Sequence, residues 1–311
     1  MQNRTLFSKK KNGEMGKMNR RDAIVGFLMA LAPFLGFLIF SLYPMGLSLV
    51  VSFFDLKSYD LSMMEFVGWK NYKFVFTNEW VRRSVRNTIE YCLSVPINIT
   101  MALFLANLFM KPLKGVRFGV LIAYIPTVCS IVGVTLAFQW IFEANYGVVN
   151  TIIDALGGKK INFMGDSRYF MPAVLVISVW MKGTNILQLQ AAMANVDQSL
   201  KEAAQIDGAN GAQIFFKVVM PSISPTVFYV LVMWLVAALQ EMTVMQLISN
   251  NGVGPDFKAM TITYYIYRMA ITNNVTEGFG RASALSWVFA IAVMIISRIL
   301  FKLSDKFVTY D

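Results

Sequence analysis

Two apolar runs flank one polar segment in the second half of the chain: MPAVLVISVWMKGTNILQLQAA at residues 171–192 and TVFYVLVMWLVAALQEMTVMQLIS at residues 226–249. The apolar residues in these runs are clustered rather than periodic. Each run is long enough to cross a membrane, because the hydrocarbon layer is about 30 Å thick and a helix rises about 1.5 Å per residue. The pair therefore predicts two membrane-spanning helices that are joined by a polar loop.

Four further stretches meet the same length requirement. Prolines inside them are tolerated, because neighbouring helices can satisfy the carbonyl groups that a proline leaves free. We therefore predict an all-α membrane protein with a basic tail at residues 1–21, a six-helix transmembrane domain at 22–305 and a second tail at 306–311. The predicted spans are Ala23–Tyr43, Val85–Met110, Phe118–Phe142, Met171–Ala192, Thr226–Ser249 and Ala282–Phe301.

The composition agrees with a membrane protein and excludes several other classes. Of the 311 residues, 56% are hydrophobic and 15% are charged, whereas soluble domains carry about 25% charged residues. A disordered chain and a disulfide-stapled secreted module are both excluded. The chain contains no histidine, which excludes histidine-based metal sites and Ser-His-Asp or Cys-His catalysis. We expect no catalytic residue and no metal ligand in this chain.

The distribution of Lys and Arg predicts which ends face the cytoplasm. The short loop 111–117 carries Lys111, Lys114 and Arg117 and no acidic residue, so it favours the inner face. The N-terminal apolar stretch lacks a small-x-small cleavage site, and we interpret it as an uncleaved first span. Both termini are then cytoplasmic. The basic tail is expected to lie near anionic lipid head groups, and no nucleic-acid partner is expected.

The loop at residues 195–221 is predicted to form two short helices that are separated by a glycine. Asp197 is a plausible N-cap for the first helix, and Gly208 is where that helix can stop. Asn210 and Gln213 have the spacing of a capping box for the second helix, and Pro221 follows its apolar stripe. These features fit an interfacial element and a docking element for a cytosolic partner equally well.

The same loop carries a recognisable signature. Glu202-Ala-Ala-x-x-x-Gly208, nine further residues and Val218-x-Met220-Pro221 resemble the EAA motif of ABC-importer permeases, with Val and Met in place of its Ile and Leu. The segments 66–72 (FVGWKNY), 145–150 (NYGVVN) and 263–267 (TYYIY) are similar to the sugar-permease branch, of the maltose and glycerol-phosphate first-permease type. The resemblance covers about residues 22–305. It implies the type I importer permease fold and a multi-pass location in the bacterial inner or plasma membrane.

The resemblance also implies that the loop is a coupling helix that fits a groove on a separate ATPase subunit. Two anionic side chains would meet basic groups of that partner, two alanines would allow close approach, and the apolar side chains would fill its pockets. The implied coupling residues are Glu202, Ala203, Ala204, Ile206, Asp207, Gly208, Phe215 and Pro221.

ATP hydrolysis is assigned to another subunit. A P-loop requires G-x4-G-K-[ST], and the segments at Gly13–Met18 and Gly157–Lys160 both fail this spacing. No cofactor is therefore expected in this chain, and ATP and Mg²⁺ are expected on two cytoplasmic ATPase subunits. The other implied partners are a second permease, a solute-binding protein at the outer loops, and membrane lipid.

Two faces of the predicted spans are candidates for ligand contact, because polar groups inside a membrane are costly. Trp180 and Thr184 share one face, and Trp234 and Glu241 share another, with Gln240 beside it. Flat aromatic rings suit the apolar face of a sugar, and a carboxylate or amide binds hydroxyl pairs. Packing or an interface anchor is an equal alternative for the tryptophans, and a hydrogen bond to the second permease is the alternative for Glu241. Asn185 is a further candidate, with a subunit interface or inner gate as its alternative.

The sequence thus predicts a permease subunit of an ATP-driven, binding-protein-dependent importer, for a sugar or oligosaccharide. An ABC permease for another solute, such as glycerol phosphate, is one alternative. An ion-coupled secondary transporter is another, although no inverted repeat supports it.

Overall fold

The computed structural model describes residues 20–56, 62, 64–112, 114–181, 183–272 and 278–307. Residues 1–19 and 308–311, which make up most of the two predicted tails, lie outside the described residues. The predicted all-α class is confirmed. The helices are α1 (Arg20–Phe37), α2 (Tyr43–Val51), α3 (Lys70–Thr77), α4 (Glu79–Cys92), α5 (Ser94–Phe109), α6 (Val116–Val128), α7 (Ile131–Ile141), α8 (Val148–Ala155), α9 (Ser167–Trp180), α10 (Gly183–Ala194), α11 (Gln198–Ile206), α12 (Gly211–Ile214), α13 (Met220–Ser222), α14 (Ser224–Leu239), α15 (Thr243–Ile248), α16 (Ile262–Tyr267) and α17 (Gly278–Phe307).

Short elements connect some of these helices. The strands β1 (Phe54–Asp55) and β2 (Glu65–Phe66) form one antiparallel pair. Single π-helical turns continue three of the helices, and a 3₁₀ turn lies in the loop before α16. These turns are Leu38–Leu42, Phe215–Val219, Arg268–Thr272 and Pro255–Phe257, the last being the 3₁₀ turn.

The described residues contain three helices that are long and apolar enough to span a membrane: Ile24–Val51, Glu79–Phe109 and Gly278–Ser304. Three further helix pairs meet the same criterion only if each bent pair is taken as one span. The pairs bend by 106° between α6 and α7, by 52° between α9 and α10, and by 73° where Gly211–Ser222 meets α14. The predicted number of spans is therefore reached only by counting the bent pairs.

Three predicted spans are not continuous helices: Met171–Ala192 bends by 52° between α9 and α10, and two others break as follows. The stretch Phe118–Phe142 breaks because Cys129 and Ser130 both take extended backbone conformations, with ψ of 150° and 131°. The stretch Thr226–Ser249 breaks after Leu239, where Met242 leaves the helical region with φ −135°. A continuous apolar sequence therefore concealed a change of direction in both places.

The core of the bundle lies where α5 packs against α10 and α9, and where α14 crosses α4 and α5. Small side chains allow close helix approach in membrane proteins. Ala102 and Ala106 on α5 and Leu189 on α10 are completely or almost completely buried. A Cβ atom on Gly183 would lie 2.2 Å from the carbonyl oxygen of Ala123, so α10 approaches α6 through a glycine.

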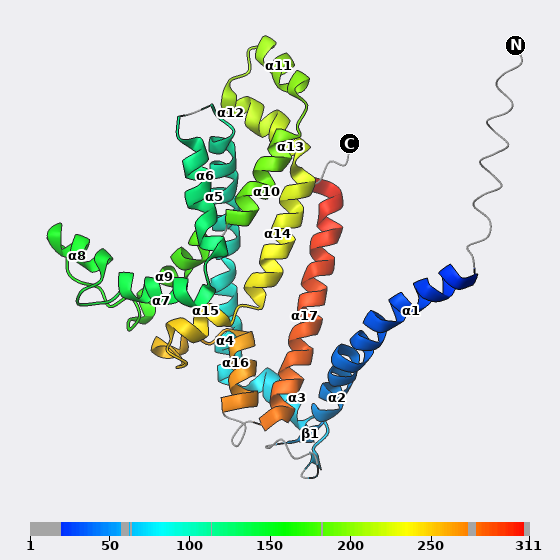
Figure 1. Cartoon of the computed structure of the whole chain (residues 1–311). Helices are drawn as coiled ribbons and strands as arrows, with labels where there is room; N and C mark the ends of the chain where they lie inside the picture. Colours follow the sequence, from blue (N-terminus) through cyan, green and yellow to red (C-terminus); the bar gives the residue numbers. More distant parts are fainter. Residues whose placement is uncertain are drawn as a thin grey trace, which may run out of the picture.

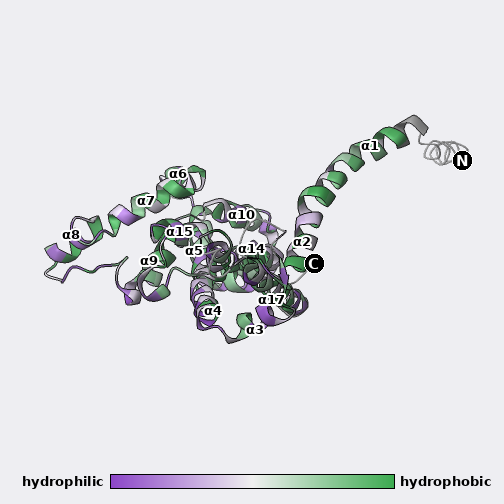
Figure 2. Ribbon diagram, turned by 90° about the horizontal axis from the view of Figure 1, so that it is seen from below, coloured by the Kyte–Doolittle hydropathy of each residue, from purple (hydrophilic) through white to green (hydrophobic). Residues whose placement is uncertain are grey.

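The helix formed by α1, a π-helical turn and α2 extends away from this bundle (Figures 1 and 2). Its lower part contacts α17, whereas no part of the 18-residue apolar window is buried. Phe27, Met29 and Phe40 are 65%, 73% and 81% exposed. A helix that is apolar all round requires lipid or another protein chain around it.

The polar loop between α10 and α14 has the predicted caps. The Asp197 side chain accepts a hydrogen bond of 2.9 Å from the Ser199 amide, which holds the pKa of that carboxyl below its usual value. Gly208 ends α11 with φ +80°. Asn210 and Gln213 form the complete predicted capping box.

Pro221 comes just after the apolar stripe of the second helix, as predicted. It lies within α13, which continues from the π-helical turn Phe215–Val219. In that turn the amide of Met220 reaches the carbonyl of Phe215. The wider turn accommodates a proline, which lacks an amide hydrogen and otherwise clashes with the preceding turn.

Gly280 on α17 provides a test of how closely α17 packs against β1 and α3. A Cβ atom there would lie 1.9 Å from the Phe54 carbonyl oxygen and 2.8 Å from Asn71 Nδ2. We expect Gly280→Ala to destabilise the protein by about 1–3 kcal/mol, because the backbone of the β1 loop must move. A lowered melting temperature in detergent measures this effect. Gly46→Ala in α2, where a Cβ atom meets nothing within 4 Å, is the matched control, and equal melting temperatures for the two variants would contradict the expectation.

Candidate functional site

The loop that contains α11 and α12 projects beyond the end of the bundle (Figure 1). None of the residues of α11 is buried. Ile206 at its end is 87% exposed and Phe216 is 67% exposed. Two large apolar side chains therefore stand on a protruding polar loop, which is typical of a protein-binding surface.

The other predicted coupling residues are divided between this surface and the bundle. Phe215 is half-buried and packs on the chain's own core, so it supports the loop from below. Its ring lies 5.1 Å from the ring of exposed Phe216. Ala204 is also half-buried. The exposed members are Glu202, Ala203, Ile206, Asp207, Gly208 and Pro221.

A small cavity lies inside the bundle between α4, α5 and α14. Its volume is about 30 Å³, which is room for one or two water molecules. The predicted face of the fifth span forms one wall, although α14 ends before Glu241 is reached. The cavity is lined by Tyr91, Ser94, Val95, Asn98, Trp234, Ala237, Ala238 and Glu241.

Glu241 connects this cavity to the break after α14. One carboxylate oxygen, Oε1, accepts a hydrogen bond of 2.9 Å from the Val244 amide at the start of α15. The other, Oε2, lies 3.5 Å from the Tyr91 hydroxyl, and the Glu241 carbonyl accepts a bond of 2.6 Å from Thr261. One carboxylate oxygen thus caps the first turn of α15, and the other faces the cavity.

Sequence reasoning missed the α4–α5 wall of this cavity. Tyr91, Ser94, Val95 and Asn98 have the same 0, 3, 4, 7 spacing that identified Trp234, Ala237, Ala238 and Glu241. Asn98 is 3% exposed, and its Oδ1 has no hydrogen-bond partner among the described residues. A buried unsatisfied acceptor in a cavity indicates a place for a ligand or a water molecule.

Four predicted contact residues do not lie at this cavity. Trp180 is the last residue of α9, is 53% exposed, and has its ring 6.2 Å from the ring of Phe138. Thr184 and Asn185 follow on α10, beyond the 52° bend, so the straight helical face predicted for Trp180 and Thr184 does not exist. Gln240 is exposed and also lies outside the cavity lining.

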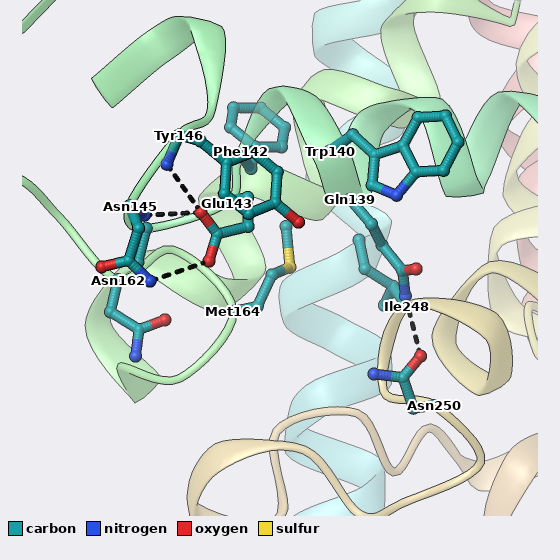
Figure 3. A pocket seen from close by; sticks show the side chains of 11 residues that line it. Gln139, Trp140, Phe142, Glu143, Asn145, Tyr146, Asn162, Met164, Ile248 and Asn250 are labelled. Atoms are coloured by element: carbon teal, nitrogen blue, oxygen red, sulfur yellow. Dashed lines mark hydrogen bonds between the residues drawn. The ribbon is translucent and has the colours of Figure 1, made fainter. Parts of the chain in front are cut away.

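A larger pocket, of about 410 Å³, lies between the end of α7, the loop that precedes α8, and the end of α15. Figure 3 shows Glu143, Asn145 and Tyr146 on one side of it and Gln139 with Asn250 on the other. The Glu143 carboxylate accepts hydrogen bonds from the amides of Tyr146 and Asn145. These bonds, that from Tyr146 foremost, hold the pKa of Glu143 below its usual value, so it is ionised at neutral pH.

Comparison with known proteins places the chain in a family. Residues 67–309 match the model of the binding-protein-dependent transport system inner membrane component. The probable ABC transporter permease protein YesP of Bacillus subtilis (strain 168) is 35% identical over 94% of both chains. The arabinooligosaccharides transport system permease protein AraP of the same organism is 29% identical, over 89% of this chain and 87% of that protein.

The fold agrees with these matches. A crystal structure of a bacterial ABC transporter involved in the import of the acidic polysaccharide alginate contains a chain that superposes with a TM-score of 0.77. The two chains are 24% identical, and the superposition covers 93% of this chain and 98% of the other. The chain therefore belongs to the family of binding-protein-dependent transport system inner membrane components, as a multi-pass permease subunit of a bacterial ABC importer.

Proposed function

We propose that this permease imports a sugar or oligosaccharide and that the cavity between α4, α5 and α14 marks its ligand path. The observation that carries this proposal is the lining: an aromatic ring on Trp234, an unsatisfied amide oxygen on Asn98, and a carboxylate oxygen of Glu241. These groups suit a polyhydroxylated ligand. The name of AraP, a relative that transports arabinooligosaccharides, supports the same class.

The size of the cavity supports an alternating-access mechanism. A volume of about 30 Å³ is far below the roughly 300 Å³ of a small-molecule pocket. A sugar would enter only when α4 and α5 move apart from α14, as in a change between outward-facing and inward-facing states. Trp180, Thr184, Asn185 and Gln240 remain candidate contacts in such an opened state or against the second permease.

We assign energy coupling to the loop 195–221. Glu202 and Asp207 offer negative charge, while Ile206 and Phe216 offer exposed apolar surface. This combination suits a groove with basic and apolar groups on an ATPase subunit. The proposed complex contains two permeases, two ATPase subunits that hold ATP and Mg²⁺, and an external solute-binding protein.

The proposed orientation follows from the position of that loop. In Figure 1 the loop and the C-terminal end of α17 lie toward the same end of the molecule, and α1 slopes from α2 toward that end. If the loop binds a cytoplasmic ATPase, both termini are cytoplasmic. The Lys and Arg of residues 111–117 favour the same orientation.

Glycerol phosphate and other anions fit the cavity less well. No lysine or arginine lines it, and its charged group is the carboxylate of Glu241. A phosphate requires cationic groups or several backbone amides. The lining therefore favours an uncharged polyhydroxylated ligand over an anionic one.

The first test replaces Glu241. We expect Glu241→Ala to lower sugar-stimulated ATPase activity of the reconstituted complex about tenfold, because a charged hydrogen-bonding group is lost from the ligand path. Glu241→Gln keeps an oxygen that can accept from the Val244 amide. Comparison of the two variants therefore separates the effect of the lost charge from the effect of the lost hydrogen bond to α15. Glu65→Ala, at an exposed glutamate of β2, is the control. Unchanged sugar-stimulated ATPase activity in both Glu241 variants would refute the assignment of Glu241 to the ligand path.

The second test reverses a charge on the loop. Glu202→Lys is expected to weaken attachment of the ATPase subunits at least about tenfold, because like charges then face each other across the interface. Co-purification of the subunits and sugar-stimulated ATPase activity measure the effect. Asp154→Lys reverses the charge of an exposed residue on α8, away from the loop, and should leave both unchanged. A Glu202→Lys complex with normal co-purification and normal ATPase stimulation would refute the assignment of Glu202 to the ATPase interface.

A further inference from the structure

The pocket between α7 and α15 has the chemistry of a carbohydrate site, although it is separate from the bundle cavity. It lies in the half of the molecule that faces away from α11 (Figure 1). Its volume of about 410 Å³ lies within the range of small-molecule sites. Trp140 and Tyr146 line it, and each is 69% exposed. Large aromatic rings therefore stand open at a concave surface.

Amide groups surround these rings. Gln139, Asn145, Asn162 and Asn250 all line the pocket. Asn145 Oδ1, Asn162 Nδ2 and Asn250 Nδ2 have no hydrogen-bond partner within the part of the chain that the structure describes. Free acceptors and donors are both present, as required by a sugar hydroxyl, which donates and accepts at once.

The charge of the pocket selects against anions. No lysine or arginine lines it, and its charged residue is Glu143. The carboxylate of Glu143 also accepts a hydrogen bond of 3.2 Å from Asn145 Nδ2, in addition to the two backbone amides. Lys160 Nζ, which donates to the Asn145 carbonyl at 3.1 Å, lies outside the lining, so an anionic ligand would meet the negative charge of Glu143 at the pocket wall.

The walls of the pocket are held in place. A Cβ atom on Gly147 would lie 2.4 Å from the Glu143 carbonyl oxygen, so the turn that presents Tyr146 requires glycine. Asn250 and Asn251 on the opposite wall have left-handed backbone, with φ of 50° and 60°. Gln246 and Arg268 hydrogen-bond to Asn251 and fix this loop. Strained backbone that is fixed by its surroundings is typical of ligand sites.

We propose that this pocket is a second carbohydrate subsite, which binds one unit of an uncharged oligosaccharide on the side of the permease opposite the coupling loop. The proposal rests on the proposed sugar import and narrows its substrate to the uncharged class. Trp140 and Tyr146 contact the apolar ring faces, and the asparagines bind the hydroxyl groups. A sugar released from the binding protein would occupy this subsite before it reaches the bundle cavity.

The experiment first identifies the sugar. ATPase activity of the full reconstituted complex is measured with its binding protein and a panel of sugars, namely arabinotriose and lactose as uncharged probes and an alginate trisaccharide as the acidic probe. We expect an uncharged probe to give the larger stimulation. Greater stimulation by the acidic probe overturns the uncharged-class inference. Stimulation by none of the sugars refutes the proposed import function itself, and the subsite with it.

Equilibrium binding of the stimulating sugar to the complex in nanodiscs, without the binding protein, then tests the subsite. We expect Trp140→Ala to weaken binding about tenfold and Asn162→Ala about threefold, because a stacking surface and a hydroxyl contact are lost. Trp140→Phe keeps a flat ring and should restore most of the affinity. Leu156→Ala, just after α8, removes an apolar side chain that is 82% exposed and outside the pocket, and this variant should bind like the wild type.

Two results of this binding measurement overturn the subsite while leaving sugar import intact. One is a wild-type complex that binds no sugar without its binding protein. The other is equal binding by Trp140→Ala, Asn162→Ala and the wild type. Restoration by Trp140→Phe excludes a folding defect as the cause of a loss in Trp140→Ala.

Discussion

The requirement that every backbone polar group in a membrane has a partner governs this structure. An unbroken helix meets it without help, whereas each break needs side chains that replace the missing backbone bonds. Glu241 does so at the end of α14, where it accepts from the Val244 amide. Asn87 and Thr88 on α4 provide the same kind of partner to the loop before α16, which lies between two predicted spans: Asn87 donates to the carbonyls of Phe257 and Met260, and Thr88 accepts from the Ile262 amide.

These side-chain hydrogen bonds, which replace missing backbone bonds, explain why polar residues of the bundle lie beside the breaks. The carboxylate that starts α15 also faces the cavity, so one residue serves both the fold and the proposed ligand path. The loop that Arg268 and Gln246 fix also carries Asn250 into the larger pocket. Both cavities thus form where the chain leaves regular structure and exposes side-chain chemistry that a continuous helix would cover.

Sequence reasoning succeeded where a local pattern determines the outcome. The caps at Asp197 and Asn210 depend only on residues within one turn, and both were predicted. The bend at Cys129 and Ser130 was missed, because hydropathy does not distinguish a straight apolar helix from a bent one. The pairing of Trp234 with Glu241 was predicted from helical spacing, although the helix ends between them. Asn98 was missed although it shares one helical face with Tyr91, Ser94 and Val95, because the sequence does not show that this face meets α14 across a cavity.

The π-helical turn Phe215–Val219 has a consequence for how the loop can vary. An α-helix rotates by about 100° per residue, and a π-helical turn contains one residue more than an α-helical turn would need. The number of residues in this turn therefore sets the rotation, about the helix axis, at which α11 is presented relative to α14. Exposed side chains such as Ile206 and Phe216 can be exchanged without altering that rotation, whereas the loss or gain of a single residue in the turn would rotate the whole surface away from its proposed partner.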